Sequence, residues 1–118
     1  MERFRFQNFR VYLDAKEYCR SCRDINKRHI DKADRSLADQ ISRALNSIVL
    51  NIAEGSADHS DAEFARFLGI SIRSVYETVA AFDLAVLYEC IGEDLSEIIE
   101  NEAHALVKQL ASFRQTLK

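Results

Sequence analysis

The sequence predicts an all-α protein, an antiparallel up-down-up-down four-helix bundle. The chain of 118 residues contains no Pro and three Gly, whereas average composition would supply about six and eight. Sandwiches, barrels and βαβ folds use both residue types at their turns. In addition, four segments carry apolar residues at steps of three and four, the spacing of one helix face. The length and globular composition predict a single domain over residues 1–118.

The first helix is expected over residues 9–28, with the side chain of Asn8 as its cap. Its apolar face consists of Val11, Tyr12, Ala15, Tyr18, Cys19, Cys22 and Ile25. A second face carries four cations at the same helical spacing, and we call this set the basic stripe. The basic stripe consists of Lys16, Arg20, Arg23 and Lys27. The polar segment that follows predicts the connection to the second helix.

The second helix is expected over residues 36–54. Its apolar seam consists of Leu37, Ile41, Leu45, Ile48 and Ile52. Gly55 follows the helix directly, where a left-handed backbone costs glycine little, so we expect it to end the helix in that conformation.

The third helix is expected over residues 61–90, and Ser60 with Glu63 predicts a capping box at its start. Apolar residues between Phe64 and Leu87 occupy more than one face of this helix. Packing of one helix face against a single bundle requires fewer apolar residues than this, so the excess favours contacts between subunits. The alternative is a helix that one bundle buries on all sides.

Gly92 is expected to end the third helix, and the segment 94–97 is expected to cap a fourth helix over residues 95–117. The connections between the four helices are short, which makes consecutive helices antiparallel neighbours. Acidic residues near the start of the fourth helix and basic residues near its end suit the helix dipole.

A polar stripe runs along the second helix beside its apolar seam. It consists of Gln40, Arg43, Ser47, Asn51 and Glu54, at steps of three, four, four and three. We interpret it as a hydrogen-bonded network inside the bundle or at a subunit interface, where such groups can fix the register. A ligand or partner site is one alternative. Catalysis is another, and it would require a pocket or metal that converges on Glu54 and Glu77.

The charge is distributed unevenly along the chain. The first 35 residues carry ten basic and six acidic side chains, and the remainder carries six basic and thirteen acidic ones. The basic part can pair with the acidic part, within or between subunits, or it can contact an anionic partner. In the second case the basic stripe is the expected anion-binding surface.

Several classes of site are not expected. Cys19 and Cys22 lie in mid-helix without a preceding strand, so we interpret them as small core residues rather than a redox pair or zinc site. No His follows Glu or Asp at the spacing of a di-iron bundle. Asp58, His59 and Asp61 cluster in the loop before the third helix. A weak metal site there is one interpretation, but we favour a solvent-exposed loop. We predict no catalytic residues, no metal and no cofactor.

The sequence also lacks an apolar stretch that could span a membrane, and its amino terminus does not resemble a secretion signal. We therefore expect a cytoplasmic protein with reduced thiols and no membrane partner.

Several motifs resemble a known family. These are the sequence from Asn51 to Gly55, the spaced residues from Leu37 to Ile48, the aromatic pattern from Glu63 to Leu68, and Ser74 with Glu77. Together they resemble the bacterial four-helix-bundle proteins encoded by intervening sequences in large-subunit ribosomal RNA genes. The accessory variability protein of diversity-generating retroelements is similar.

The resemblance implies a ring-shaped homo-oligomer, typically a pentamer, without an established enzymatic activity. Some relatives are basic and are thought to bind nucleic acid or a reverse transcriptase. In this chain acidic residues stand after the Ala-Glu-Gly motif, where the family often carries basic ones, and carboxylates repel phosphates. We therefore expect a non-enzymatic, homo-oligomeric scaffold or interaction protein. The alternative is a nucleic-acid or ribonucleoprotein accessory protein that binds through the basic stripe.

Overall fold

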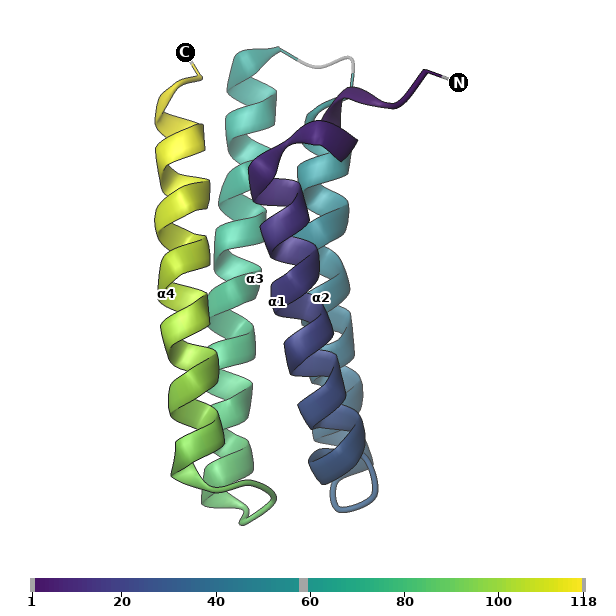
Figure 1. Cartoon of the computed structure of the whole chain (residues 1–118), viewed down its shortest axis with the longest axis vertical. Helices are drawn as coiled ribbons and strands as arrows, with labels where there is room; N and C mark the ends of the chain where they lie inside the picture. Colours follow the sequence, from purple (N-terminus) through teal and green to yellow (C-terminus); the bar gives the residue numbers. More distant parts are fainter. Residues whose placement is uncertain (1, 58–59, 118) are drawn as a thin grey trace.

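The computed structural model describes residues 2–57 and 60–117 and confirms the predicted four-helix bundle (Figure 1). A short 3-10 turn, η1 (Arg5–Asn8), precedes α1 (Arg10–Ile25), which continues into a π-helical turn, η2 (Asn26–Ile30). The other helices are α2 (Arg35–Gly55), α3 (Asp61–Leu87) and α4 (Glu93–Gln115). Asp58 and His59, considered above for weak metal binding, lie outside the described residues.

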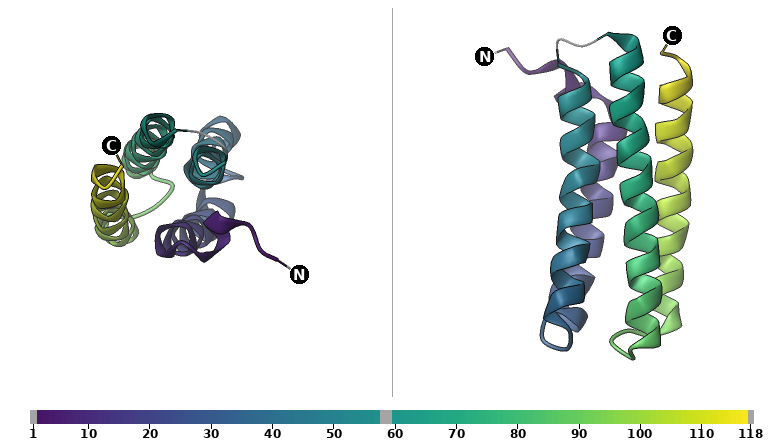
Figure 2. Two further views of the ribbon diagram at one scale, coloured as in Figure 1. Left: turned by 90° about the horizontal axis from the view of Figure 1, so that it is seen from above. Right: turned by 180° about the vertical axis from the view of Figure 1, so that it is seen from behind.

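The helices stand at the corners of a quadrilateral, with α1 and α2 on one side and α3 and α4 on the other (Figure 2). Each helix runs antiparallel to the next one in the chain. The molecule is elongated along the helices, with extents of 43 × 29 × 20 Å. None of the helices in the described chain is both long and apolar enough to cross a membrane.

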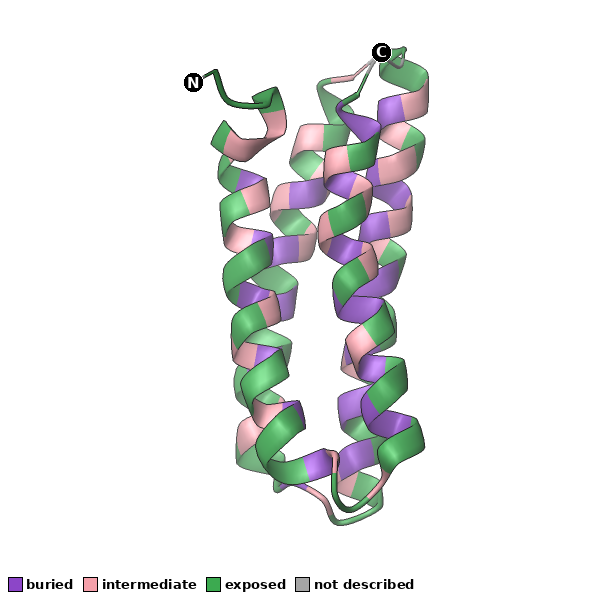
Figure 3. Cartoon of the chain, turned by 90° about the vertical axis from the view of Figure 1, so that its right-hand side faces the viewer, coloured by how far each residue is buried: buried purple, intermediate pink, exposed green. Residues whose placement is uncertain are grey.

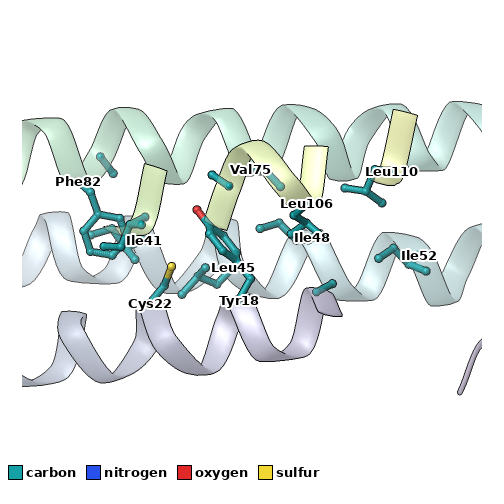
Figure 4. Close-up of a cluster of buried hydrophobic side chains, with 14 of the residues drawn as sticks. Tyr18, Cys22, Ile41, Leu45, Ile48, Ile52, Val75, Phe82, Leu106 and Leu110 are labelled. Carbon is teal, nitrogen blue, oxygen red and sulfur yellow. The ribbon is translucent and has the colours of Figure 1, made fainter. Parts of the chain in front are cut away.

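The core fills the space between the four helices, and every helix turns its buried face towards it (Figure 3). Large aliphatic and aromatic side chains dominate it, and burial of each one stabilises the fold by about 1.5–3 kcal/mol. The close-up in Figure 4 shows how they interdigitate along the bundle axis. Fully enclosed members include Ile41, Ile48, Ile52, Leu68, Phe82, Ile99 and Leu110.

The start of α1 differs from the prediction, because Asn8 does not cap it. Residues 5–8 form η1 instead, in which the backbone N–H of Phe4 donates to the Gln7 side chain at 2.9 Å. Phe9 occupies the cap position without a side-chain hydrogen bond. Its ring packs against Phe64 of α3 and Phe113 of α4, with centroids 6.3 and 5.3 Å away. Aromatic packing therefore fixes this helix end in place of a polar cap.

The glycines also act differently from the expectation. Gly55 is the last residue of α2 and does not adopt a left-handed backbone. A Cβ at this position would lie 2.7 Å from the Cβ of Phe67 and 2.8 Å from a ring carbon of Phe64. The absence of a side chain at Gly55 therefore lets α2 and α3 approach each other closely. At the start of α3 the capping prediction is confirmed for Ser60, whose Oγ accepts from the Glu63 N–H at 3.2 Å.

The turn between α3 and α4 begins earlier than predicted. The helix α3 ends at Leu87, and the left-handed residue beyond it is Glu89, with φ 65°. Gly92 caps the start of α4 rather than ending α3, and α4 begins at Glu93, before the expected capping segment 94–97. The carboxylates of Glu93 and Asp94 consequently lie in its first turn, where the helix dipole favours them.

Candidate functional site

The polar stripe of α2 lies along the boundary with α3, where the structure joins it in two places. Gln40 Nε2 donates to Glu77 Oε2 at 3.5 Å. Further along, Asn51 Nδ2 donates to the carbonyl oxygen and Oγ of Ser47 at 2.8 and 3.0 Å. Ser74 Oγ of α3 donates to Ser47 Oγ at 2.8 Å. The bonds of Gln40 with Glu77 and of Ser47 with Ser74 tie α2 to α3 at the edge of their interface.

The charged members of the polar stripe do not join this network within one chain. Arg43 and Glu54 are both exposed, and neither forms a side-chain hydrogen bond or ion pair with another described residue. Asn51 bonds to Ser47 instead of to either of them. A role for Arg43 and Glu54 between subunits stays a prediction. No group of described residues collects three metal-binding side chains, at Glu54 and Glu77 or elsewhere.

Two buried hydroxyls of α3 also connect helices. Ser71 Oγ donates to the backbone carbonyl of Ile48 in α2 at 2.8 Å. Thr78 Oγ1 lies 2.7 Å from the Tyr18 hydroxyl of α1. Their helical spacing with Phe64 and Phe82 indicated the core-facing side, but nothing in the sequence indicated these partners.

The basic stripe is exposed along α1 and η2, and three of its members, Lys16, Arg20 and Arg23, border the groove between α1 and α2. Lys16 Nζ lies 5.1 Å from the ring centroid of Tyr12, and Arg20 lies 3.7 Å from Glu17. Arg23 and Lys27 form no ion pair with any described residue. The four cations share one face of the molecule, and Arg20 alone among them forms an ion pair with a described residue.

The groove between α1 and α2, which we call the basic groove, has a volume of about 730 Å³. Four cations and two carboxylates border it, so its net charge is positive. Its lining also includes Leu13. One helical turn beyond the lining residue Asn46 lies Leu50, whose side chain is 63% exposed. The lining residues are Arg10, Leu13, Asp14, Lys16, Glu17, Cys19, Arg20, Arg23, Asn46 and Val49.

A second groove, which we call the acidic groove, lies on the other side of the molecule between α3 and α4. It has a volume of about 340 Å³ and a largely apolar lining. Its two carboxylates belong to Asp83 and Glu100, and His104 Nε2 lies 3.9 Å from Glu100 Oε2. The lining residues are Val75, Tyr76, Val79, Ala80, Asp83, Glu100, Ala103, His104 and Val107.

Two of the three thiols, those of Cys19 and Cys22, lie in environments that disfavour reactivity. Cys22 is fully enclosed, and burial raises its pKa to about 12. Burial likewise raises the pKa of Cys19 to about 12, and its Sγ donates to the Leu45 carbonyl at 3.3 Å. All three cysteines are free. A protonated, enclosed thiol is a poor nucleophile and metal ligand, which agrees with the interpretation of Cys19 and Cys22 as core residues.

The architecture places the chain in the class of antiparallel four-helix bundles. Residues 7–112 match the sequence model of the 23S rRNA-intervening sequence protein family, and the chain belongs to that family. Among solved structures, it is similar to a protein of unknown function from the S23 ribosomal protein family of Bacteroides thetaiotaomicron. The similarity covers 88% of this chain and 97% of that one, with 25% identity and a TM-score of 0.79. No curated protein matches the sequence.

Proposed function

We propose that the protein is a homo-oligomeric scaffold or interaction protein that acts by assembly rather than catalysis. The observation that carries this proposal is the apolar surface that one chain leaves exposed. Tyr76 and Leu87 of α3 are 65% and 70% exposed, and Leu50 of α2 is 63% exposed. Tyr76 and Leu87 lie on one face of α3 and Leu50 lies on α2, and apolar surface left exposed on a folded chain can be buried against another copy. The family resemblance implies five subunits, and the three free thiols suit the reducing cytoplasm.

The mass of the purified protein in solution tests this proposal. We expect light scattering at micromolar concentration to report a closed oligomer, and a pentamer if the family resemblance extends to the number of subunits. A monomer at that concentration would overturn the proposal. Pull-down from native lysate, with and without nuclease, would then separate protein partners from partners held through nucleic acid.

A second candidate function is binding of nucleic acid, and it is favoured by the unpaired charges of Arg23, which lines the basic groove, and of Lys27, one helical turn beyond Arg23. Phosphate contacts supply most non-specific affinity, and copies of the basic stripe around an oligomer would add avidity. We expect a structured hairpin RNA to bind at about 50 mM salt and to dissociate as salt increases. Absence of binding there excludes this function. Binding that survives the change of all four stripe residues to Ala moves the site elsewhere.

A further inference from the structure

We infer that the acidic groove of one subunit docks onto the basic groove of a second copy, so that neighbouring subunits meet head to tail. This inference rests on the proposed homo-oligomer and specifies which surfaces form it. The basic groove lies between α1 and α2 and the acidic groove between α3 and α4. These two helix pairs form opposite sides of the bundle (Figure 2), so one chain cannot join the two grooves to each other. Contacts between two different surfaces of identical subunits generate rings when the rotation closes.

Charge complementarity selects a second copy as the occupant. The acidic groove offers Asp83 and Glu100 in an otherwise apolar lining. The basic groove offers an excess of cations, among them Arg23, which has no ion partner within the described residues. Oppositely charged surfaces steer association and fix its register.

The registers of the helices place these charges at one height along the bundle. Asp14 of α1 and Gln109 of α4 are at the same height, because Gln109 Nε2 donates to Asp14 Oδ2 at 3.0 Å. The two helices are antiparallel and rise equally per residue. Arg23 lies nine residues after Asp14 in α1, and Glu100 lies nine residues before Gln109 in α4. Arg23 and Glu100 are therefore also at the same height along the bundle axis.

A second hydrogen bond gives the same result independently. Tyr18 of α1 and Thr78 of α3 are joined at 2.7 Å, and these two helices run in the same direction. Five residues further along each helix stand Arg23 and Asp83. A rotation about an axis parallel to the bundle moves a subunit sideways without changing its height. Such a rotation therefore brings Arg23 level with both Asp83 and Glu100 of the neighbouring copy.

Apolar side chains on the two faces supply the remaining contact. Tyr76 lines the acidic groove and Leu13 the basic groove. Leu87 follows Asp83, and Leu50 follows Asn46, by one helical turn, and all four apolar side chains are exposed in the single chain. The same register places Lys16 at the height of Tyr76, whose ring can accept a cation on its face. The interface would thus bury apolar surface and pair charges at the same time. It also covers the basic stripe, so it competes with the binding of nucleic acid there.

Paired charge reversals test the inference by mass photometry and light scattering. One variant carries R20E and R23E, and the other carries D83R and E100R. Each places like charges across every contact of its own homo-oligomer, so we expect association at least about 100-fold weaker than in the unchanged protein. The control variant R3E/K32E has the same change in net charge as R20E/R23E, outside both grooves, and should assemble as the unchanged protein does.

Recombination of the charges provides the decisive result. A mixture of the two variants restores complementarity only between unlike subunits, so we expect alternating assemblies that close only with an even number of subunits. A fourfold variant, R20E/R23E/D83R/E100R, is complementary to itself and should recover the original mass. If the unchanged protein is a monomer, the proposed function fails. If it is an oligomer and both paired variants assemble as well as it does, or if neither recombination restores assembly, the inferred interface is wrong and the proposed function stands.

Discussion

Tyr18 donates a 2.7 Å hydrogen bond to Thr78 in the middle of the core, across the diagonal between α1 and α3. The direction follows from proton counting, because the single hydroxyl proton of Thr78 is already directed at the Val75 carbonyl, 2.7 Å away. Burial raises the pKa of Tyr18 well above its ordinary value of 10.0, so the donor stays protonated. This bond satisfies two polar groups that the apolar core would otherwise isolate.

Removal of the donor should cost a measurable but limited stability. We expect Tyr18→Phe to lower the free energy of unfolding by about 1 kcal/mol, the usual net worth of one such bond. Urea denaturation checks this value. The matched control is Tyr88→Phe, because Tyr88 is 53% exposed and its hydroxyl can bond to water. Equal effects at both positions would contradict the structural role given to Tyr18.

The close approach of α2 and α3 at Gly55 predicts a larger effect. A Cβ there would meet atoms of Phe67 and Phe64 at under 3 Å, so Gly55→Ala should destabilise the fold by about 1–3 kcal/mol through overpacking. Gly92→Ala is the control, since nothing lies within 4 Å of the Cβ it would add. Thermal unfolding would show a clearly lowered midpoint for the first variant and a smaller decrease for the second, which changes only the N-cap residue of α4. A harmless Gly55→Ala would mean that the two helices can separate at no cost.

The backbone of Glu89 offers a route to stabilisation. Its φ of 65° lies in the left-handed region, which costs a residue with a side chain roughly 1–2 kcal/mol and costs glycine little. Glycine loses more conformational entropy on folding, which offsets part of this relief. We therefore expect Glu89→Gly to raise the free energy of unfolding by about 0.5 kcal/mol. Chemical denaturation measures the gain. Glu89→Ala keeps the strain and removes the carboxylate, so a gain of equal size in that variant would refute the explanation.

The buried thiols predict a loss of stability at alkaline pH. The pKa of Cys22 is raised from 9.0 to about 12 in the folded chain, so the unfolded chain releases this proton first as the pH rises. The contribution of Cys22 is therefore complete below pH 9.0 and is lost between pH 9.0 and about 12. Between about pH 8 and 10 we expect the loss of about 1 kcal/mol from this group.

Urea unfolding at the two pH values checks this expectation, with Cys22→Ala as the comparison. The variant should start less stable, because it leaves a small cavity, but its stability should fall less steeply with pH. An identical slope in both proteins would show that Cys22 ionises as easily in the folded chain as in the unfolded one.

The sequence predicted the helices well because each one buries a continuous face, which imposes a visible periodicity. Helix ends were predicted less well, since they depend on contacts between helices. The ring of Phe9 replaced the expected Asn8 cap, and Gly55 serves close packing rather than a turn. The basic stripe was predictable for the same periodic reason. The common height of Arg23, Asp83 and Glu100 was not, because it depends on how three helices pack against each other.

The short connections of the bundle have a kinetic consequence. Every helix packs against its neighbour in the chain. Contacts between segments far apart in the sequence are fewer, and they join α1 to α4 and, through Tyr18 and Thr78, to α3. Chains with such local contacts fold in microseconds to milliseconds, whereas association of subunits takes milliseconds to minutes and depends on concentration. We therefore expect each newly made chain to complete its bundle before it encounters another copy. The encounter then takes place between finished surfaces, and its rate depends on how much protein the cell has accumulated.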